Sequence, residues 1–252
     1  MLLGEKVQIF WRKPNFIAYG KVYVLSSESL DQKERKTYHQ WFVHNVFSRS
    51  CCEKRERRQM ILKGQLHTHT SMSDGRLTLQ EVANEYSRLG FHFLAFTDHD
   101  HLLRPSYQDE IKKVKSDLLI FVGIELTVHC SKGYVHVSRI EGKHEIIHIF
   151  NHPGDCDLNV RQTFECIEEV AMKYPLDAIE ITNHGFYTPQ FDIPEIPYLK
   201  IAADDSHNSM GCGRAWIEVD MASEIKHDTI LKAIKSGKYH NCFAGNEFQK
   251  AI

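Results

Sequence analysis

The sequence predicts an α/β fold built around a closed or nearly closed parallel barrel. Beyond position 60, short β-prone segments alternate with helical patterns, and seven segments have the length and composition of strands. Residue types that bind metals stand at the carboxyl ends of these segments, where barrels of this class carry their active sites. The 252 residues are enough for one such domain with a small addition.

The first 60 residues do not follow this alternation and are expected to form an N-terminal extension. Two apolar, β-prone stretches separated by a Pro-Asn pair predict a hairpin within residues 1–25. From Ser29 to about Met60 the chain contains neither Gly nor Pro, and its apolar residues follow helical spacing. We therefore expect a hairpin and a helix over residues 1–60, followed by the barrel domain over residues 61–252.

The barrel domain is predicted to alternate strands with helices. The predicted strands are residues 64–69, 93–99, 118–125, 134–140, 145–152, 177–183 and 199–206. The helical patterns cover residues 77–90, 108–117, 161–173 and 226–236. Thr78 can cap the first of these helices and Gly90 can end it, while Gly237 stops the last one.

Histidines and carboxylates gather at the ends of the predicted strands. His67 and His69 are two residues apart, so in a strand both side chains point to the same face. Because the carboxyl ends of parallel barrel strands meet on one face, we expect these side chains to converge. The candidates at strand ends are His67, His69, Asp98, His99, Glu125, His136, His152, Asp205 and His207.

This set of side chains is typical of a metal centre. Imidazole and carboxylate ligands together suit Zn, Mn or Fe. The candidates outnumber the ligands of one ion, so we expect two or three divalent metal ions, with Glu125 as a possible bridge. Two metals about 3.5–4 Å apart can activate a bridging water and stabilise both the attacking and the leaving oxygen. The pattern therefore predicts hydrolysis without a serine or cysteine nucleophile.

The composition is that of an ordinary soluble protein. A net charge of −2 gives no bulk attraction to nucleic acid or acidic membranes. The seven cysteines are odd in number and include no C-x-x-C pair, which indicates reduced thiols. Charges interrupt the apolar residues of the N-terminus, and no apolar run is long enough to span a bilayer. We expect a cytoplasmic protein with a small-molecule substrate and no membrane partner.

The motifs resemble those of the PHP (polymerase and histidinol phosphatase) superfamily. They are HTH at 67–69, SDG at 73–75, TDH at 97–99, GIE at 123–125, HP at 152–153 and DSH at 205–207. Longer segments, such as LKGQLHTHTSMSDG and ILKAIKSGKYHNCFAG, are similar to the CehA–McbA-like (carbaryl-hydrolase-like) branch. The resemblance covers about residues 61–246 and implies a distorted seven-stranded (β/α)7 TIM-like PHP barrel.

The resemblance also implies three groups of metal ligands. They are His67, His69, Glu125 and Asp205; Glu125, His136 and His152; and Asp74, His99 and His207. Many relatives have a histidine where Asp74 stands, and SDG is also a common turn composition, so a dinuclear centre is an alternative. His136 has rivals nearby in His129, His144 and His148.

Other residues are candidates for proton transfer and substrate binding. Asp98 is expected to orient a neighbouring group or manage protons, and His184 to protonate a leaving group. Arg104 and Arg214 could grip a phosphate through bidentate hydrogen bonds, and His101 could contact substrate. For Asp98 the alternative is direct metal binding, and for the arginines and His184 it is an ordinary surface or loop role.

Three functions are compatible with these residues. Most relatives with known activity cleave phosphoester bonds, so the favoured function is a phosphoesterase acting on small phosphomonoesters or nucleotides through a metal-bridged hydroxide. The alternative is hydrolysis of a carbamate, ester or amide, with Phe186, Tyr187 and Phe191 lining an apolar pocket. A non-catalytic metal-binding module is the third, and the apparently full ligand set argues against it.

Overall fold

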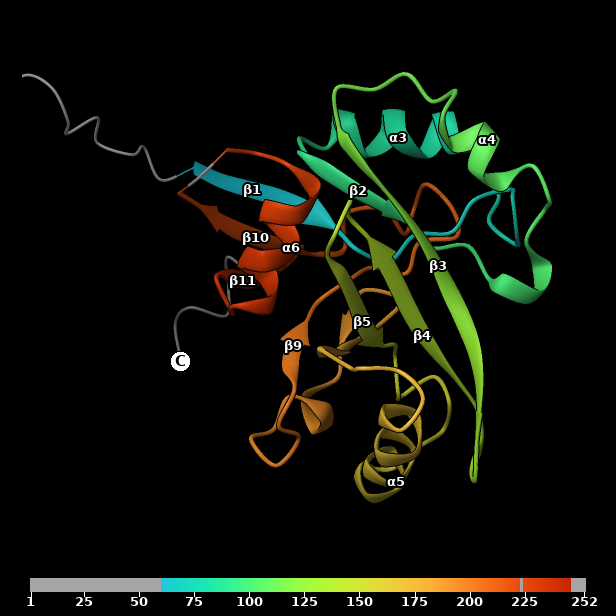
Figure 1. Cartoon of the computed structure of the whole chain (residues 1–252), viewed down its shortest axis with the longest axis vertical. Coiled ribbons are helices and arrows are strands. Elements are labelled where there is room, and N and C mark those ends of the chain that lie inside the picture. Colours follow the sequence, from blue (N-terminus) through green and yellow to red (C-terminus); the bar gives the residue numbers. More distant parts are fainter. Residues whose placement is uncertain (1–59, 223, 246–252) are drawn as a thin grey trace, which may run out of the picture. The chain divides into compact units, whose positions relative to one another are not determined.

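The computed structural model describes residues 60–222 and 224–245. A nine-stranded sheet organises this part of the chain, with the order β11-β10-β1-β2-β3-β4-β5-β6-β9 (Figure 1). Its strands are β1 (Met60–Gln65), β2 (Phe93–Phe96), β3 (Leu119–Cys130), β4 (Gly133–Glu141), β5 (Ile146–Phe150), β6 (Ala178–Glu180), β9 (Leu199–Ile201), β10 (Ala215–Met221) and β11 (Tyr239–Phe243). The short strands β7 (Thr182–Asn183) and β8 (Phe186–Tyr187) form a separate hairpin. The N-terminal hairpin and helix predicted for residues 1–60 lie almost wholly outside the described residues.

The two edge strands of the sheet, β11 and β9, contact each other, so the sheet closes into a near-barrel. At the carboxyl ends of the strands, the chain beyond β1 meets the chain beyond β9 through a parallel bridge between Thr68 and Ser206. At the other end, Tyr239 and Asn241 of β11 each donate a side-chain hydrogen bond of 2.8 Å to the carbonyl of Lys200 in β9. This closure brings the ends of the first and last barrel strands together.

The prediction of seven repeating βα units is wrong in the middle of the domain. Strands β3, β4 and β5 are antiparallel neighbours joined by short turns, without helices between them. A parallel pair needs a crossover of about a dozen residues or more, and the apolar segments between positions 118 and 152 leave no room for one. Strands β10 and β11 were not predicted: β10 pairs antiparallel with both β1 and β11, and β11 lies at the edge of the sheet.

The helices begin and end close to the predicted positions. Within the described residues they are α3 (Leu79–Arg88), α4 (Tyr107–Ile111), α5 (Val160–Ala171) and α6 (His227–Lys235), with short 3-10 turns at Asp100–Leu102 and Pro189–Phe191. Thr78 caps α3, as the sequence predicts, and the structure adds a capping box between Thr78 and Glu81. Helix α4 is much shorter than predicted. None of these helices combines the length and hydrophobicity needed to cross a membrane.

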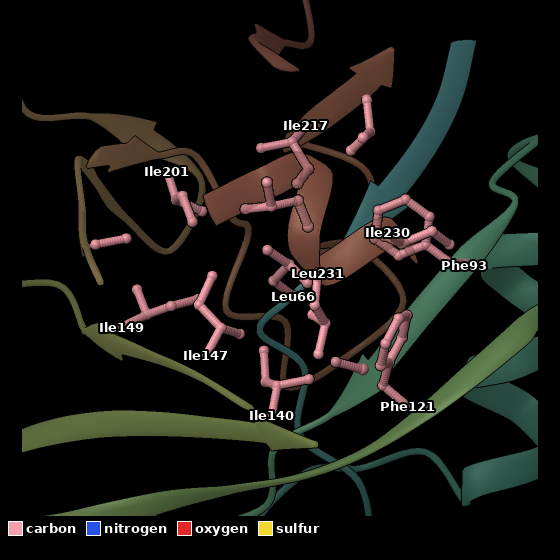
Figure 2. Packing of buried hydrophobic residues seen from close by; sticks show 14 of the residues in the cluster. Leu66, Phe93, Phe121, Ile140, Ile147, Ile149, Ile201, Ile217, Ile230 and Leu231 are labelled. Carbon is pink, nitrogen blue, oxygen red and sulfur yellow. The ribbon is translucent and has the colours of Figure 1, made fainter. Parts of the chain in front are cut away.

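Apolar side chains fill the interior of the near-barrel. Figure 2 shows Leu66, Phe93, Phe121, Ile140, Ile147, Ile149, Ile201, Ile217, Ile230 and Leu231 of this cluster. They come from strands all around the sheet and from α6, which packs its apolar face into the interior. Full burial of such a side chain contributes about 1.5–3 kcal/mol. The apolar filling supports the polar residues that gather at the carboxyl ends of the strands.

Candidate metal centre

Two histidines beyond the end of β1 form the middle of the site. His67 and His69 are buried, and their Nε2 atoms lie 3.1 Å apart. Both side chains face the same side, as their spacing predicts. The Nε2 atoms of His67 and His69 lie 3.3 Å and 3.1 Å from Asp205 Oδ1. The bridge between the chain beyond β1 and the chain beyond β9 therefore brings these residues, distant in sequence, into one cluster.

Glu125 on β3 contacts histidines from several strands. Its Oε1 lies 3.1 Å from His152 Nε2 and 3.5 Å from His136 Nδ1. Its Oε2 lies 2.9 Å from His99 Nδ1 and 3.2 Å from His69 Nε2. The carboxylate is fully buried, so it depends on these partners for its solvation.

Asp74 joins the cluster from the turn that follows the HTH motif. Its Oδ1 lies 3.3 Å from His69 Nδ1, and its Oδ2 lies 3.3 Å from His207 Nε2 and 3.5 Å from His99 Nε2. The side chain is 37% exposed, so this edge of the cluster is open to solvent. The aspartate of the SDG motif is therefore placed as a ligand would be, within a turn.

His136 is the histidine between Glu125 and His152 that reaches the cluster. Its rings lie 4.9 Å and 5.3 Å, centroid to centroid, from those of His99 and His152. The three rivals lie elsewhere. His129 is exposed beside Tyr134, His144 bonds through its backbone to Asp228, and His148 packs near Tyr174.

Two buried groups that orient these side chains escaped the sequence analysis. Glu180, at the end of β6, places Oε2 3.0 Å from His67 Nδ1. A carboxylate on Nδ1 sets the tautomer and turns Nε2 toward the cluster. The side-chain amide of Asn151 donates a hydrogen bond of 2.7 Å to Glu125 Oε1. Each had a signal in the sequence, since Glu180 is a charge within an apolar strand and Asn151 directly precedes His152.

Asp98 bonds to the turn that carries Asp74. Its Oδ1 accepts hydrogen bonds from the Thr70 N–H at 2.8 Å and from the Ser73 hydroxyl at 2.6 Å. Its Oδ2 accepts from the Thr70 hydroxyl at 2.9 Å. This geometry suits a residue that positions its neighbours, and a role for Asp98 in proton transfer stays a prediction.

His184 stands at the tip of the β7–β8 hairpin, at the edge of the cluster. His184 and Gly185 have φ values of 47° and 81°, as both central residues of a type I′ turn do. The Nδ1 atom of His184 lies 3.0 Å from Asp205 Oδ2, and the side chain is 48% exposed. The hydrogen bond to Asp205 raises the pKa of His184. A half-exposed imidazole beside the cluster can exchange protons with solvent and with a bound molecule.

The two candidate arginines lie in different pockets. Arg214 lines a pocket of about 220 Å³ next to the cluster, together with His184, Asp205 and His207. Arg104 is exposed and lines a separate pocket of about 370 Å³ with Ser71, Met72, Thr78, Leu79, Gln80, Ser106, Glu110, Lys113 and Val114. Arg214 therefore shares a pocket with three residues of the cluster and its edge, whereas Arg104 does not. His101, also exposed, lies near His99 with a ring separation of 5.3 Å.

Comparison with known proteins now identifies the family. A PHP domain model matches residues 65–244, which is most of the chain.

The chain belongs to the PHP domain family.

Solved structures share the fold of this PHP domain. One is a two-domain protein from Bacteroides vulgatus containing a predicted PHP-like metal-dependent phosphoesterase, with 19% identity and a TM-score of 0.56 over 73% of our chain. Our chain spans 65% of that protein. Another is PsfC from Pseudomonas syringae, with 11% identity and a TM-score of 0.53 over 73% of our chain and 92% of PsfC. None of the curated proteins compared matches in sequence.

The side chains of this PHP domain fit divalent cations. Groups whose ligand atoms lie within 4.8 Å of one another are His69, Asp74, His99 and His207; His67, His69 and Glu125; His67, His152 and Asp205; His99, Glu125 and His136; and His184, Asp205 and His207. Within the described residues, the buried atoms His99 Nδ1, Glu125 Oε2 and Asp205 Oδ1 make no hydrogen bond, although each lies within ion-pair distance of another side chain of the cluster. Burying such atoms unpaired is unfavourable, and a cation would satisfy them.

Within the cluster, the opposite charges of His67 and Glu125 each favour the ionised form of the other side chain. Burial by itself would lower the pKa of His67, but the charges of Asp205 and Glu125 outweigh it and raise this pKa to about 10. Burial would likewise raise the pKa of Glu125, yet the neighbouring imidazoles hold it well below its usual range. The carboxylates thus stay ionised, which is the form that binds metal.

Proposed function

We propose that this PHP domain is a metal-dependent hydrolase that cleaves phosphoesters, with small phosphomonoesters or nucleotides as substrates. The observation that carries the proposal is the buried cluster in which imidazoles and carboxylates from six strands, and from the segments that follow them, converge with atoms that make no hydrogen bond. Family membership supports it, and so does the phosphoesterase named in the similar Bacteroides vulgatus protein.

We assign the metal ligands to the residues that converge in this cluster. They are His67, His69, Asp74, His99, Glu125, His136, His152, Asp205 and His207. Glu125 would be shared between ions, since each of its oxygens faces different imidazoles. Two or three divalent ions would supply Lewis-acid charge for the phosphoryl oxygens and a nucleophile from water at neutral pH.

The remaining roles fall to the residues at the rim. His184 directs Nδ1 toward Asp205, which leaves Nε2 to donate a proton to the leaving oxygen. Arg214 would bind a phosphate oxygen from the same pocket. Asp98 would hold the turn that presents Asp74.

The test is metal content together with phosphate release. The full chain is purified without chelator, its Zn, Mn and Fe are measured per chain, and it is assayed against a panel of phosphomonoesters. We expect two or three equivalents of metal and phosphate release that His67→Ala abolishes. The control is His129→Ala, an exposed histidine away from the cluster, which should keep both properties. Absence of bound metal, even after reconstitution, would overturn the proposal.

A second candidate reaction is hydrolysis of a carbamate, ester or amide by the same centre. It is favoured by Phe186 and Tyr187, which are 64% and 44% exposed on the hairpin that carries His184. Phe191 does not belong to this surface, because it is 1% exposed and packs in the core. Metal binding with release from ester or carbamate chromogens, and none from phosphomonoesters, would favour this reaction. Metal binding without any turnover would favour a non-catalytic module.

A further inference from the structure

An aromatic side chain stands exposed on the hairpin that carries His184. Phe186 pairs with Asn183 in the β7–β8 ladder, two residues after His184. Single exposed apolar side chains are common on protein surfaces and by themselves indicate nothing. Phe186 differs from an ordinary exposed residue for two reasons. A cation lies against its hairpin, and the candidate proton donor His184 stands at the tip of the same hairpin.

The cation is Arg214, which makes two contacts with the hairpin and packs closely against its glycine. Its Cζ lies 5.0 Å from the centroid of the Phe186 ring, within the range of a cation–π contact. Its Nη1 donates a hydrogen bond of 3.4 Å to the carbonyl of His184. A Cβ on Gly185 would lie 2.5 Å from Arg214 Cβ, so the glycine permits this close approach.

Arg214 is also the only lysine or arginine among the residues that line the 220 Å³ pocket. The other lining residues are His184, Asp204, Asp205, Ser206, His207, Asn208 and Gly211. An anionic group bound there would share the pocket with the guanidinium and with the candidate metal ligands Asp205 and His207. The Phe186 ring lies on the guanidinium, at the side of the hairpin.

We propose that Phe186 and Arg214 form an aryl-binding subsite that selects phosphomonoesters whose leaving group carries an aromatic ring. This inference rests on the proposed function. The leaving oxygen must lie within hydrogen-bond reach of His184, so the group attached to it extends over the same hairpin. There an aromatic ring can stack against Phe186 and the guanidinium plane, whereas a saturated group of equal size gains no such contact.

Binding of non-hydrolysable phosphonates tests the subsite without relying on turnover. The full chain, supplied with Zn²⁺, is titrated by calorimetry with phenylphosphonate, cyclohexylphosphonate and methylphosphonate. We expect phenylphosphonate to bind about threefold to tenfold more tightly than cyclohexylphosphonate. Phe186→Ala should remove that preference and leave methylphosphonate affinity within about twofold, while Phe186→Trp should keep the preference.

A matched control separates the subsite from general surface effects. Met210 is 76% exposed in the loop after His207, and Met210→Ala should leave all three affinities unchanged. Equal affinities of the wild-type chain for phenylphosphonate and cyclohexylphosphonate would overturn the subsite. So would a Phe186→Ala variant that lowers phenylphosphonate and methylphosphonate binding alike.

The same proteins distinguish failure of the subsite from failure of the proposed function. Phosphate release from phenyl phosphate and glycerol 2-phosphate is measured in parallel. Phosphate release without an aryl preference that depends on Phe186 would leave the phosphoesterase standing and remove the subsite. Preferential phenylphosphonate binding without any phosphate release would remove the proposed reaction and leave an aryl-acid binding site.

Discussion

Glu125 is the residue with the most contacts in the candidate metal centre. Five imidazoles lie within 3.5 Å of its two oxygens, those of His67, His69, His99, His136 and His152. As a ligand shared between metal ions, this buried carboxylate would have no substitute among the other side chains of the cluster. Its negative charge, more than its shape, is what the centre requires.

We therefore expect Glu125→Gln to lose at least one equivalent of metal and to reduce hydrolysis by about 100-fold or more, since the amide keeps the volume and removes the charge. Metal analysis per chain and kcat measure the two effects. Glu141→Gln is the control, because Glu141 is 41% exposed on the neighbouring strand β4 and pairs with Arg139. Full metal content in Glu125→Gln would contradict the bridging role.

Glu180 affects the cluster indirectly, through its hydrogen bond to His67. We expect Glu180→Ala to weaken metal binding by about 10-fold to 100-fold, because His67 loses the partner that fixes its tautomer and ring orientation. Competition with a chelator measures the affinity. Glu180→Gln should recover part of it, since an amide oxygen can still accept from Nδ1, and unchanged affinity in the alanine variant would refute the positioning role.

At the scale of elements, the antiparallel meander of β3, β4 and β5 brings its ligands to one edge. Because β4 runs against its neighbours, the beginning of β4 lies at the edge where β3 and β5 approach their ends. His136, near the start of β4, thereby meets Glu125 on β3 and His152 beyond β5. The backbone supports this alignment, because the Asn151 N–H donates a hydrogen bond of 2.9 Å to the His136 carbonyl.

Helix α3 offers a test of local stability away from the centre. Thr78→Ala removes the side-chain acceptor for the Glu81 N–H in the capping box and should lower the free energy of unfolding by about 1 kcal/mol. Urea unfolding monitored by circular dichroism measures the change. Ser87→Ala, at an exposed position of the same helix, should cause no loss. Equal stability of Thr78→Ala and the parent would show that the cap contributes nothing.

At the scale of the whole molecule, the near-barrel concentrates opposite charges in a buried site that no local element could stabilise. Without metal, protonated imidazoles and ionised carboxylates neutralise one another, as the raised pKa of His67 and the lowered pKa of Glu125 indicate. A bound metal ion would replace the protons on the imidazoles, and the same ionised carboxylates would be its ligands. Stability and metal content are therefore linked.

This linkage predicts a pH dependence for the metal-free protein. The folded-state pKa of His67 is about 10 against 6.5 in the unfolded chain, so its contribution is fully present below pH 6.5 and is lost as pH rises toward 10. We expect the melting temperature of chelator-treated protein to fall over this window. Zinc-loaded protein should not show this fall, because metal binding favours the deprotonated imidazole. Parallel melting curves with and without zinc would contradict the assignment.

The types of residue that form the candidate metal centre could be predicted from the sequence alone. His67 and His69, with their spacing of two, and the carboxylates at strand ends indicate metal ligands because ligand chemistry belongs to the side chain and spacing to the local backbone. The Thr78 cap of α3 is local for the same reason, and the sequence predicted it. Even the family could be named from such short motifs, whereas its CehA–McbA-like branch stays a prediction.

The way in which these residues come together could be seen only in the tertiary structure. The antiparallel pairing of β3 to β5, the added strands β10 and β11, and the separation of Arg104 from Arg214 depend on contacts between segments distant in the chain. Glu180 and Asn151 gain their roles from neighbours on other strands, so a charge in an apolar strand and a position before His152 did not by themselves reveal these roles. Pairing between strands is a property of the whole sheet, since each strand is stable only with its partners.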